Sequence, residues 1–170
     1  VLTANGNPEE AIEKDNQSLL ICSPLKDTIT MVRNYFNLGI AYNEIQKFDT
    51  SLTYLLKALE GAEQMNYNYL IIQCYNQLGS THRKLENHDK SIEYHRKVLY
   101  NPVMDVDWER SYAYYGLAFN YYSLKDFDKA IAFADTGLLI AYKVNVKYDI
   151  QELTELLSIV HAEKGDYKKA

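Results

Sequence analysis

The amino-acid sequence predicts an all-α fold, a right-handed α-solenoid of antiparallel helix pairs. A leucine followed by a small residue recurs about every 40 residues, at Leu38, Leu78, Leu117 and Leu157. Aromatic residues stand at constant distances around these leucines, and the 170 residues include only 7 Gly and 3 Pro. Such a period is typical of repeats that are too small to bury an apolar face alone, so that each must stack on the next.

Each repeat carries one helical pattern around its leucine. An aromatic residue stands three positions before the leucine in three repeats, and an aromatic residue or a histidine stands four positions after it. Residues at i, i+3, i+4 and i+7 share one face of a helix, so these side chains are expected to pack between helices. The predicted repeat-packing residues are Tyr35, Leu38, Gly39, Tyr42, Ser51, Tyr75, Leu78, Gly79, His82, Ser91, Tyr114, Leu117, Ala118, Tyr121, Ala130 and Leu157.

The pattern also predicts the helices in chain order. Pro8 suits the first position of a helix. Asp49, Asp89 and Asp128 stand where a carboxylate can accept the free N–H groups of a helix start. The predicted spans are a lone second helix at 8–22, pairs at 27–45 with 49–65, 67–86 with 89–100 and 106–124 with 127–144, and a first helix at 147–164.

These helices form one predicted domain over residues 1–170. It consists of a partial repeat at 1–26, repeats at 27–66, 67–105 and 106–146, and a partial repeat at 147–170. Since both ends fall inside a repeat, the sequence predicts a fragment of a longer array.

The aromatic…Leu-Gly…Tyr…Ala order, seen in Tyr35, Leu38-Gly39 and Tyr42, resembles the tetratricopeptide repeat family of helix–turn–helix units. The resemblance runs nearly end to end, although the period exceeds the family's usual length of about 34 residues. It implies that the first helices line an inner groove and that ligand contacts come from four spaced positions in each repeat. The implied groove residues are Arg33, Phe36, Asn37, Ile40, Asn43, Gln73, Asn76, Ser80, Arg83, Tyr112, Tyr115, Phe119 and Tyr122, with Glu152, Glu155, Ile159 and Ala162 in the last repeat.

Two interpretations of the aromatic stripe in the third repeat stand side by side. Tyr112, Tyr115, Phe119 and Tyr122 could accept the apolar side chains of a bound peptide. The same helical spacing is equally typical of rings that are buried against a neighbouring helix.

Composition and motifs narrow the class of function. The net charge of −5 argues against nonspecific binding to nucleic acids or to an anionic membrane surface. The chain has no apolar run long enough to span a membrane and no nucleophile, phosphate-loop or zinc-protease motif, so no catalytic residue, cofactor or metal site is predicted. Two lone thiols, Cys22 and Cys74, form neither a metal motif nor an expected disulfide. All four histidines take repeat-packing positions.

The sequence therefore predicts a non-catalytic scaffold that binds a protein or peptide. Repeats of about 40 residues resemble those of bacterial signalling proteins, which implies the sensory or interaction region of a larger regulator. One alternative is a structural module that assembles with itself into a homo-oligomer, and another is a regulatory array tethered to an enzyme such as a histidine kinase. Phe36 and Ile40 replace the Lys and Asn of the family's chaperone-tail clamp, which disfavours that ligand.

Overall fold

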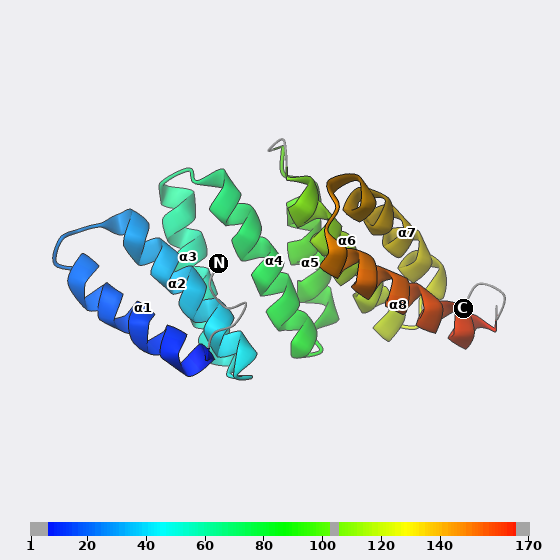
Figure 1. Ribbon diagram of the computed structural model, residues 1–170, viewed down its shortest axis with the longest axis horizontal. Coiled ribbons are helices and arrows are strands. Elements are labelled where there is room, and N and C mark those ends of the chain that lie inside the picture. The colour runs from blue at the N-terminus through cyan, green and yellow to red at the C-terminus, as the bar shows by residue number, and fades with distance from the viewer. Residues whose placement is uncertain (1–6, 103–105, 166–170) are drawn as a thin grey trace. The chain divides into compact units, whose positions relative to one another are not determined.

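The computed structural model describes residues 7–102 and 106–165, and these contain eight helices and no strand (Figure 1). The all-α prediction is confirmed, and each predicted helix is present with both ends within two residues of the expected bounds. The helices are α1 (Pro8–Cys22), α2 (Thr28–Glu44), α3 (Phe48–Gln64), α4 (Asn68–Lys84), α5 (His88–Leu99), α6 (Asp107–Ser123), α7 (Phe127–Val144) and α8 (Lys147–Lys164).

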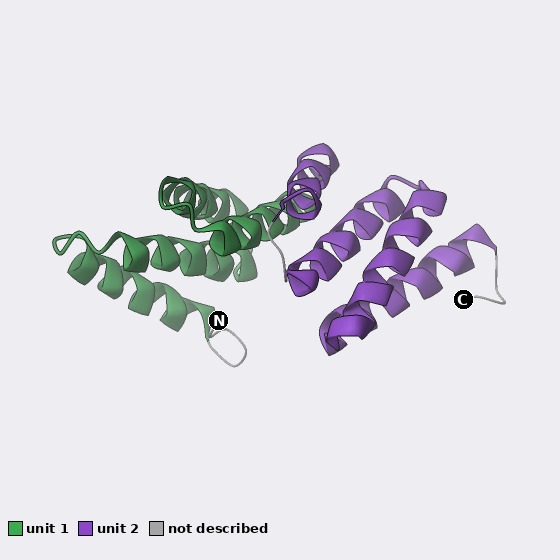
Figure 2. Cartoon of the chain, turned by 90° about the horizontal axis from the view of Figure 1, so that it is seen from above, with its two compact units in different colours: residues 1–85 green, residues 86–170 purple. Residues whose placement is uncertain are grey.

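The chain forms two compact units, residues 1–85 and 86–170, which we call unit 1 and unit 2 (Figure 2). In unit 1, α2 packs against α1 and α3, α3 packs against α4, and α2 also touches α4. In unit 2, α6 packs against α5 and α7, α7 packs against α8, and α6 also touches α8. In both units, therefore, two first helices of successive repeats lie in contact along one layer.

Turns with a left-handed residue end the helices and set the repeat length. Gln46, Asn66 and Lys125 have φ values of 59°, 52° and 61°. After α2, the N–H of Lys47 donates to the carbonyl of Tyr42 at 2.9 Å, the six-to-one bond of a Schellman motif. Two helices of 17 residues, α2 and α3, joined by three-residue turns account for a period of about 40 residues.

The helix starts differ from the prediction in one respect. Asp49, Asp89 and Asp128 lie in the first turn of their helices, not at the cap. The caps are the residues that follow the left-handed turn residue, and Asn87 and Asp126 accept a backbone N–H there at 3.4 and 3.3 Å. The three aspartates can still interact favourably with the helix dipole.

The repeat leucines occupy the core. Leu38, Leu78 and Leu117 are fully buried, whereas Leu157 is half-buried. Of the other predicted packing residues, Gly39, Gly79, Ala118, Ser51, Ser91, Ala130 and Tyr121 are buried, and Tyr35, Tyr42, Tyr75, His82 and Tyr114 are half-buried.

Close helix approach explains the small residue after the leucine. A methyl group at Gly39 would lie 2.6 Å from Cδ2 of Leu55 on α3. The hydroxyl of Ser51, also on α3, donates to the carbonyl of Gly39 at 2.7 Å. Gly39 therefore gives α3 both the space and an acceptor to lie directly on α2.

Candidate peptide-binding surface

The aromatic stripe of unit 2 is a continuous row of rings along α6. The ring centroids of Tyr112 and Tyr115 lie 6.2 Å apart, those of Tyr115 and Phe119 lie 6.3 Å apart, and those of Phe119 and Tyr122 lie 6.1 Å apart. Interplanar angles of 51° to 77° make these tilted or edge-to-face contacts, which aromatic pairs prefer.

Glutamates of α8 hold the tyrosine hydroxyls of this row. Tyr115 donates to Oε2 of Glu152 at 2.9 Å, and Tyr122 donates to Oε1 of Glu163 at 2.6 Å. Lys125 also donates to Glu163, at 2.8 Å. The hydrogen bond to Glu163, together with burial, raises the pKa of the Tyr122 phenol. These bonds anchor the rings to a neighbouring helix that carries several carboxylates.

The stripe belongs partly to the core and partly to the surface. Tyr115 is 8% exposed and shares a buried cluster with Leu153, Leu156 and Val160, while Phe119 packs against the edge of that cluster. The side chains of Tyr112, Phe119 and Tyr122 are only half-buried. Tyr115 is therefore part of the core, and Tyr112, Phe119 and Tyr122 remain partly accessible to a ligand.

The predicted residues of α8 lie beside this row. Glu155 and Ile159 are exposed, and Glu152 and Ala162 are half-buried. We define the first-helix face of unit 2 as the side of α6 and α8 that carries Tyr112, Tyr115, Phe119, Tyr122, Glu152, Glu155, Ile159 and Ala162.

In unit 1, the predicted groove residues of α2 point in more than one direction. Arg33 is exposed and donates to the hydroxyl of Tyr67, just before α4, at 3.0 Å. Asn37 instead donates to Asp15 of α1 at 3.5 Å, and burial raises the pKa of that carboxyl. Four further predicted residues of unit 1 are half-buried: Phe36 and Ile40 on α2, and Gln73 and Arg83 on α4.

Three polar residues expected on an open groove are buried. Asn43 donates to the hydroxyl of Thr81 at 2.6 Å and accepts from Lys84 at 2.5 Å, so it joins α2 to α4. Ser80 is also buried, and Asn76 is only 1% exposed. The sequence predicted that a ligand would contact Asn43, Asn76 and Ser80. Their side chains are short, and neighbouring helices enclose them in the structure. The open surface is narrower than predicted.

Buried amides join helices at positions that the sequence pattern did not single out. Asn34 on α2 donates to Ser18 on α1 at 2.7 Å, and Asn120 on α6 donates to Ser91 on α5 at 2.7 Å. Each asparagine stands three or four positions from a repeat leucine. That position on a packing face is the signal that could have revealed it.

The histidines and thiols lie in packing positions. His95 is fully buried, and a methyl group at Gly116 would overlap its ring. The Nδ1 atom of His88 lies 2.9 Å from Oδ1 of Asn120. Cys22 and Cys74 are buried free thiols, and burial raises the pKa of Cys74 to about 12, which leaves it protonated and unreactive. Within residues 7–102 and 106–165, no three His, Cys, Asp or Glu side chains are grouped so as to hold a metal ion.

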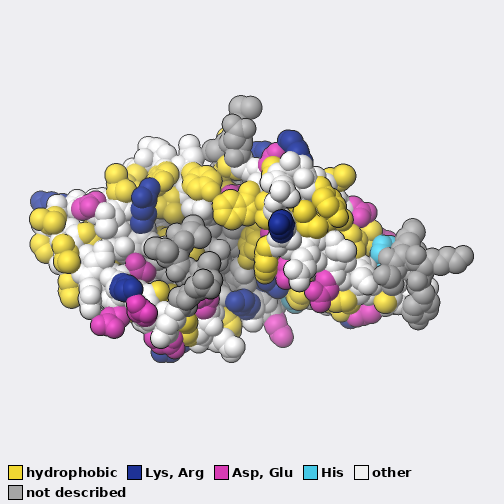
Figure 3. Space-filling view, viewed as in Figure 1, with side chains coloured by type: hydrophobic (Ala, Val, Ile, Leu, Met, Phe, Trp, Pro, Cys, Tyr) yellow, Lys and Arg dark blue, Asp and Glu magenta, His cyan; other side chains and the backbone are white. Residues whose placement is uncertain are grey.

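Apolar side chains are exposed where α1 meets α2. Leu20, Ile21, Leu25 and Ile29 are each more than half exposed, and Figure 3 shows hydrophobic side chains at this end of unit 1. None of the helices that the structure describes is long and apolar enough to cross a membrane.

Comparison with known proteins agrees with this architecture. A solved structure, the crystal structure of BtubC (BKLC) from P. vanneervenii, superposes with a TM-score of 0.82 over 97% of this chain and 69% of that one. The two are 19% identical, so the likeness shows the fold. No curated protein matches the sequence. Two family models described as tetratricopeptide repeat match residues 30–99 and 111–143. Together these matches cover more than half of the chain, which belongs to the tetratricopeptide repeat family.

Proposed function

We propose that this chain is a non-catalytic protein-interaction scaffold whose first-helix face in unit 2 binds linear peptides with apolar and basic side chains. Tetratricopeptide repeats mediate protein interactions, which supports the general class. The observation that carries the specific proposal is that Tyr112, Phe119 and Tyr122 on α6 are only half-buried and lie beside the carboxylates of α8.

The chemistry of this face selects the ligand. Half-buried rings such as Phe119 present an apolar edge with little side-chain entropy to lose, and they suit aliphatic or aromatic side chains of a peptide. Glu152 and Glu163 keep the tyrosine hydroxyls in place, and Glu155 is exposed beside them. A basic side chain would meet both carboxylates and ring faces, each of which attracts a cation.

We place this scaffold in the sensory or interaction region of a larger bacterial regulatory or signal-transduction protein. The support is the repeat of about 40 residues, built from 17-residue helices, which resembles the repeats of bacterial regulators. An output domain such as a kinase or a DNA-binding domain in the full-length protein would support this role. A full-length protein without an output domain would contradict it.

Peptide selection followed by calorimetry tests the binding surface. Peptides selected by the full chain from a phage-displayed random library should be rich in apolar and basic residues. Phe119→Ala should weaken their binding by about tenfold or more, because it removes a central ring. Glu155→Gln should weaken binding only of peptides that carry Lys or Arg.

Tyr142→Ala is the matched control, because this exposed tyrosine lies on α7, outside the first-helix face. Circular dichroism should show unchanged helicity in all three variants. Equal affinity of the wild type and Phe119→Ala for every selected peptide would refute the proposed surface.

A further inference from the structure

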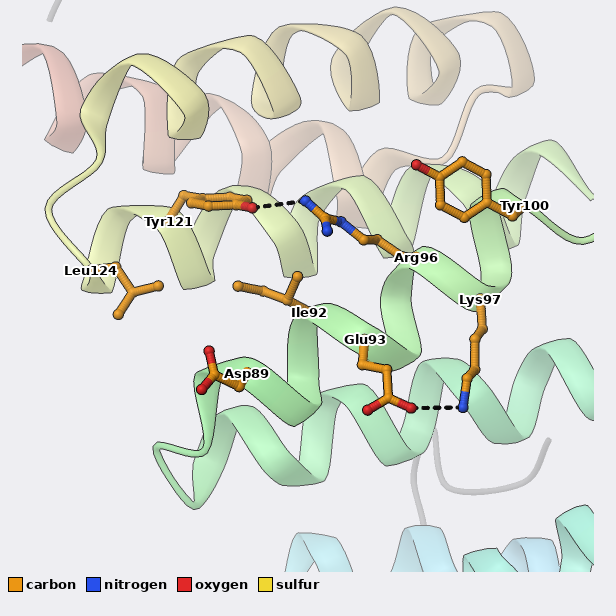
Figure 4. A pocket seen from close by; sticks show the side chains of 8 residues that line it. All are labelled: Asp89, Ile92, Glu93, Arg96, Lys97, Tyr100, Tyr121 and Leu124. Atoms are coloured by element: carbon orange, nitrogen blue, oxygen red, sulfur yellow. Dashed lines mark hydrogen bonds and ion pairs between the residues drawn. The ribbon is translucent and has the colours of Figure 1, made fainter.

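A cleft separate from the first-helix face lies wholly within unit 2, between α5 and the end of α6. The cleft has a volume of about 490 Å³, and Figure 4 shows the side chains that line it. Its lining residues are Asp89, Ile92, Glu93, Arg96, Lys97, Tyr100, Tyr121 and Leu124. The lining residues that belong to α5 are three or four positions apart and share one face of the helix. The cleft therefore runs along α5.

The charges in this cleft are not equivalent. Glu93 pairs with Lys97 at 2.8 Å and with Lys90 at 3.3 Å, so these three groups satisfy one another. Arg96 is exposed, and its Nη2 atom donates to the hydroxyl of Tyr121 at 3.0 Å (Figure 4). Among the residues the structure describes, no carboxylate pairs with Arg96. Its guanidinium group therefore keeps donors for a ligand.

The hydroxyl of Tyr121 fixes the position of the Arg96 guanidinium group. The ring of Tyr121 stacks on Phe133 of α7, with centroids 5.4 Å apart, and Nζ of Lys129 lies 5.1 Å from the ring centroid. A ring packed in this way gives its hydroxyl a defined position. The bond to Tyr121 thus orients Arg96 while using only one of its five N–H donors.

A cleft of similar volume at the end of α1 in unit 1 has no charged side chain in its lining. Asn16 stands at the same distance from the start of α1 as Arg96 does from the start of α5, and Leu20 stands in the place of Tyr100. Asn16 and Leu20 line this cleft together with Leu19, Ser23, Pro24 and Tyr35. The arginine at this position is therefore present in unit 2 but is not a general feature of the second helices of the repeats.

We propose that the α5–α6 cleft is a second peptide site, which binds an extended segment through an acidic side chain on Arg96 and an apolar side chain on Ile92 and Leu124. Asp89 sets the orientation of the segment. It lies two helical turns from Arg96, about 10 Å along α5, which corresponds to about three residues of extended peptide. A basic residue three positions from the acid would therefore reach Asp89. This site does not depend on the aromatic row of α6.

Nuclear magnetic resonance with two matched probes tests the proposal. The probes are the blocked peptides acetyl-Lys-Ala-Leu-Glu-amide and acetyl-Lys-Ala-Leu-Gln-amide, titrated into the full ¹⁵N-labelled chain. The Glu peptide should shift the amide signals of Ile92, Arg96 and Leu124. The Gln peptide should bind about tenfold more weakly, because a charge-assisted hydrogen bond contributes that much.

Substitutions distinguish binding in this cleft from a general attraction between the peptide and positive charge on unit 2. Arg96→Gln should reduce binding of the Glu peptide about tenfold, whereas Lys147→Gln removes one positive charge elsewhere in unit 2 and should leave it unchanged. Tyr121→Phe keeps the packed ring but removes the hydroxyl that orients Arg96, so it should weaken binding of the Glu peptide, but less than Arg96→Gln does.

Two results would overturn the proposal. One is the absence of signal shifts in α5 and the end of α6 at millimolar Glu peptide. The other is equal binding of the Glu peptide to the wild type and to folded Arg96→Gln protein. In the first case, shifts confined to the first-helix face would instead support the surface proposed above.

Discussion

The side-chain amide of Asn120 on α6 donates to the hydroxyl of Ser91 on α5 at 2.7 Å. The same nitrogen donates to the carbonyl of Gly116 at 2.7 Å, and Oδ1 of Asn120 lies 2.9 Å from Nδ1 of His88. Because Asn120 is fully buried, these bonds replace the water that its amide would otherwise bind. This one side chain therefore couples the first two helices of unit 2.

Removal of this amide should destabilise unit 2. Asn120→Ala leaves Ser91 and His88 without their shared partner, and the free energy of unfolding should fall by about 1–3 kcal/mol. Urea denaturation measures the change. Asn68→Ala, at the exposed first residue of α4, is the control and should change stability by less than about 0.5 kcal/mol. Equal effects of the two substitutions would contradict the role of Asn120.

The repeat leucines should contribute strongly to stability. Leu38→Ala in unit 1 and Leu117→Ala in unit 2 each remove a fully buried side chain, and each should cost about 2–5 kcal/mol through lost burial and the cavity left behind. Thermal denaturation measures both. Leu139→Ala should have little effect, because Leu139 is 73% exposed. Near-normal melting of both buried variants would mean that the repeat register is wrong.

The left-handed turn residues offer a route to higher stability. Gln46 has a φ of 59°, which costs a residue with a Cβ atom about 1–2 kcal/mol. Gln46→Gly should remove that cost and raise the free energy of unfolding by about 1 kcal/mol, less the added entropy of the unfolded chain. Asn66→Gly should gain less, since asparagine tolerates this conformation better. A destabilised Gln46→Gly protein would show that the side chain of Gln46 has a role of its own.

The buried carboxyl of Asp149 should make stability depend on pH. Asp149 is 2% exposed at the start of α8, and burial raises its pKa although Ser111 donates to it. Between the pKa of Asp149 in the unfolded chain and its higher pKa in the folded chain, the folded chain holds a proton that the unfolded chain has released. The contribution of Asp149 to stability therefore falls as the pH rises through its folded pKa.

Asp149→Asn should consequently be more stable than the wild type at neutral pH, and the difference should shrink as the pH falls towards 4. Asp126→Asn is the opposite control. The hydrogen bond from Lys129 lowers the pKa of Asp126, so the wild type should be the more stable protein at neutral pH and should lose that advantage in acid. Thermal melts from neutral pH to well below 3.8, the ordinary pKa of an aspartate, measure both. A constant difference for Asp149→Asn would show that its carboxyl is not desolvated.

The helices, their order and their packing face follow from the sequence without any knowledge of the tertiary structure. These features depend on local rules, because a period near 3.6 residues, a cap and a left-handed turn residue act over a few positions. Leu38, Leu78 and Leu117 are thus recognised from spacing alone, and all three are fully buried.

Which side chains remain open to a ligand depends instead on the packing of the helices. Ser80 and Phe119 both stand two residues after their repeat leucine, yet Ser80 is buried and Phe119 is only half-buried. Arg96 meets Tyr121 across 25 residues of chain, a contact that no local pattern contains. A helical period specifies the direction of a side chain, but its exposure and its partners depend on how neighbouring helices pack against it.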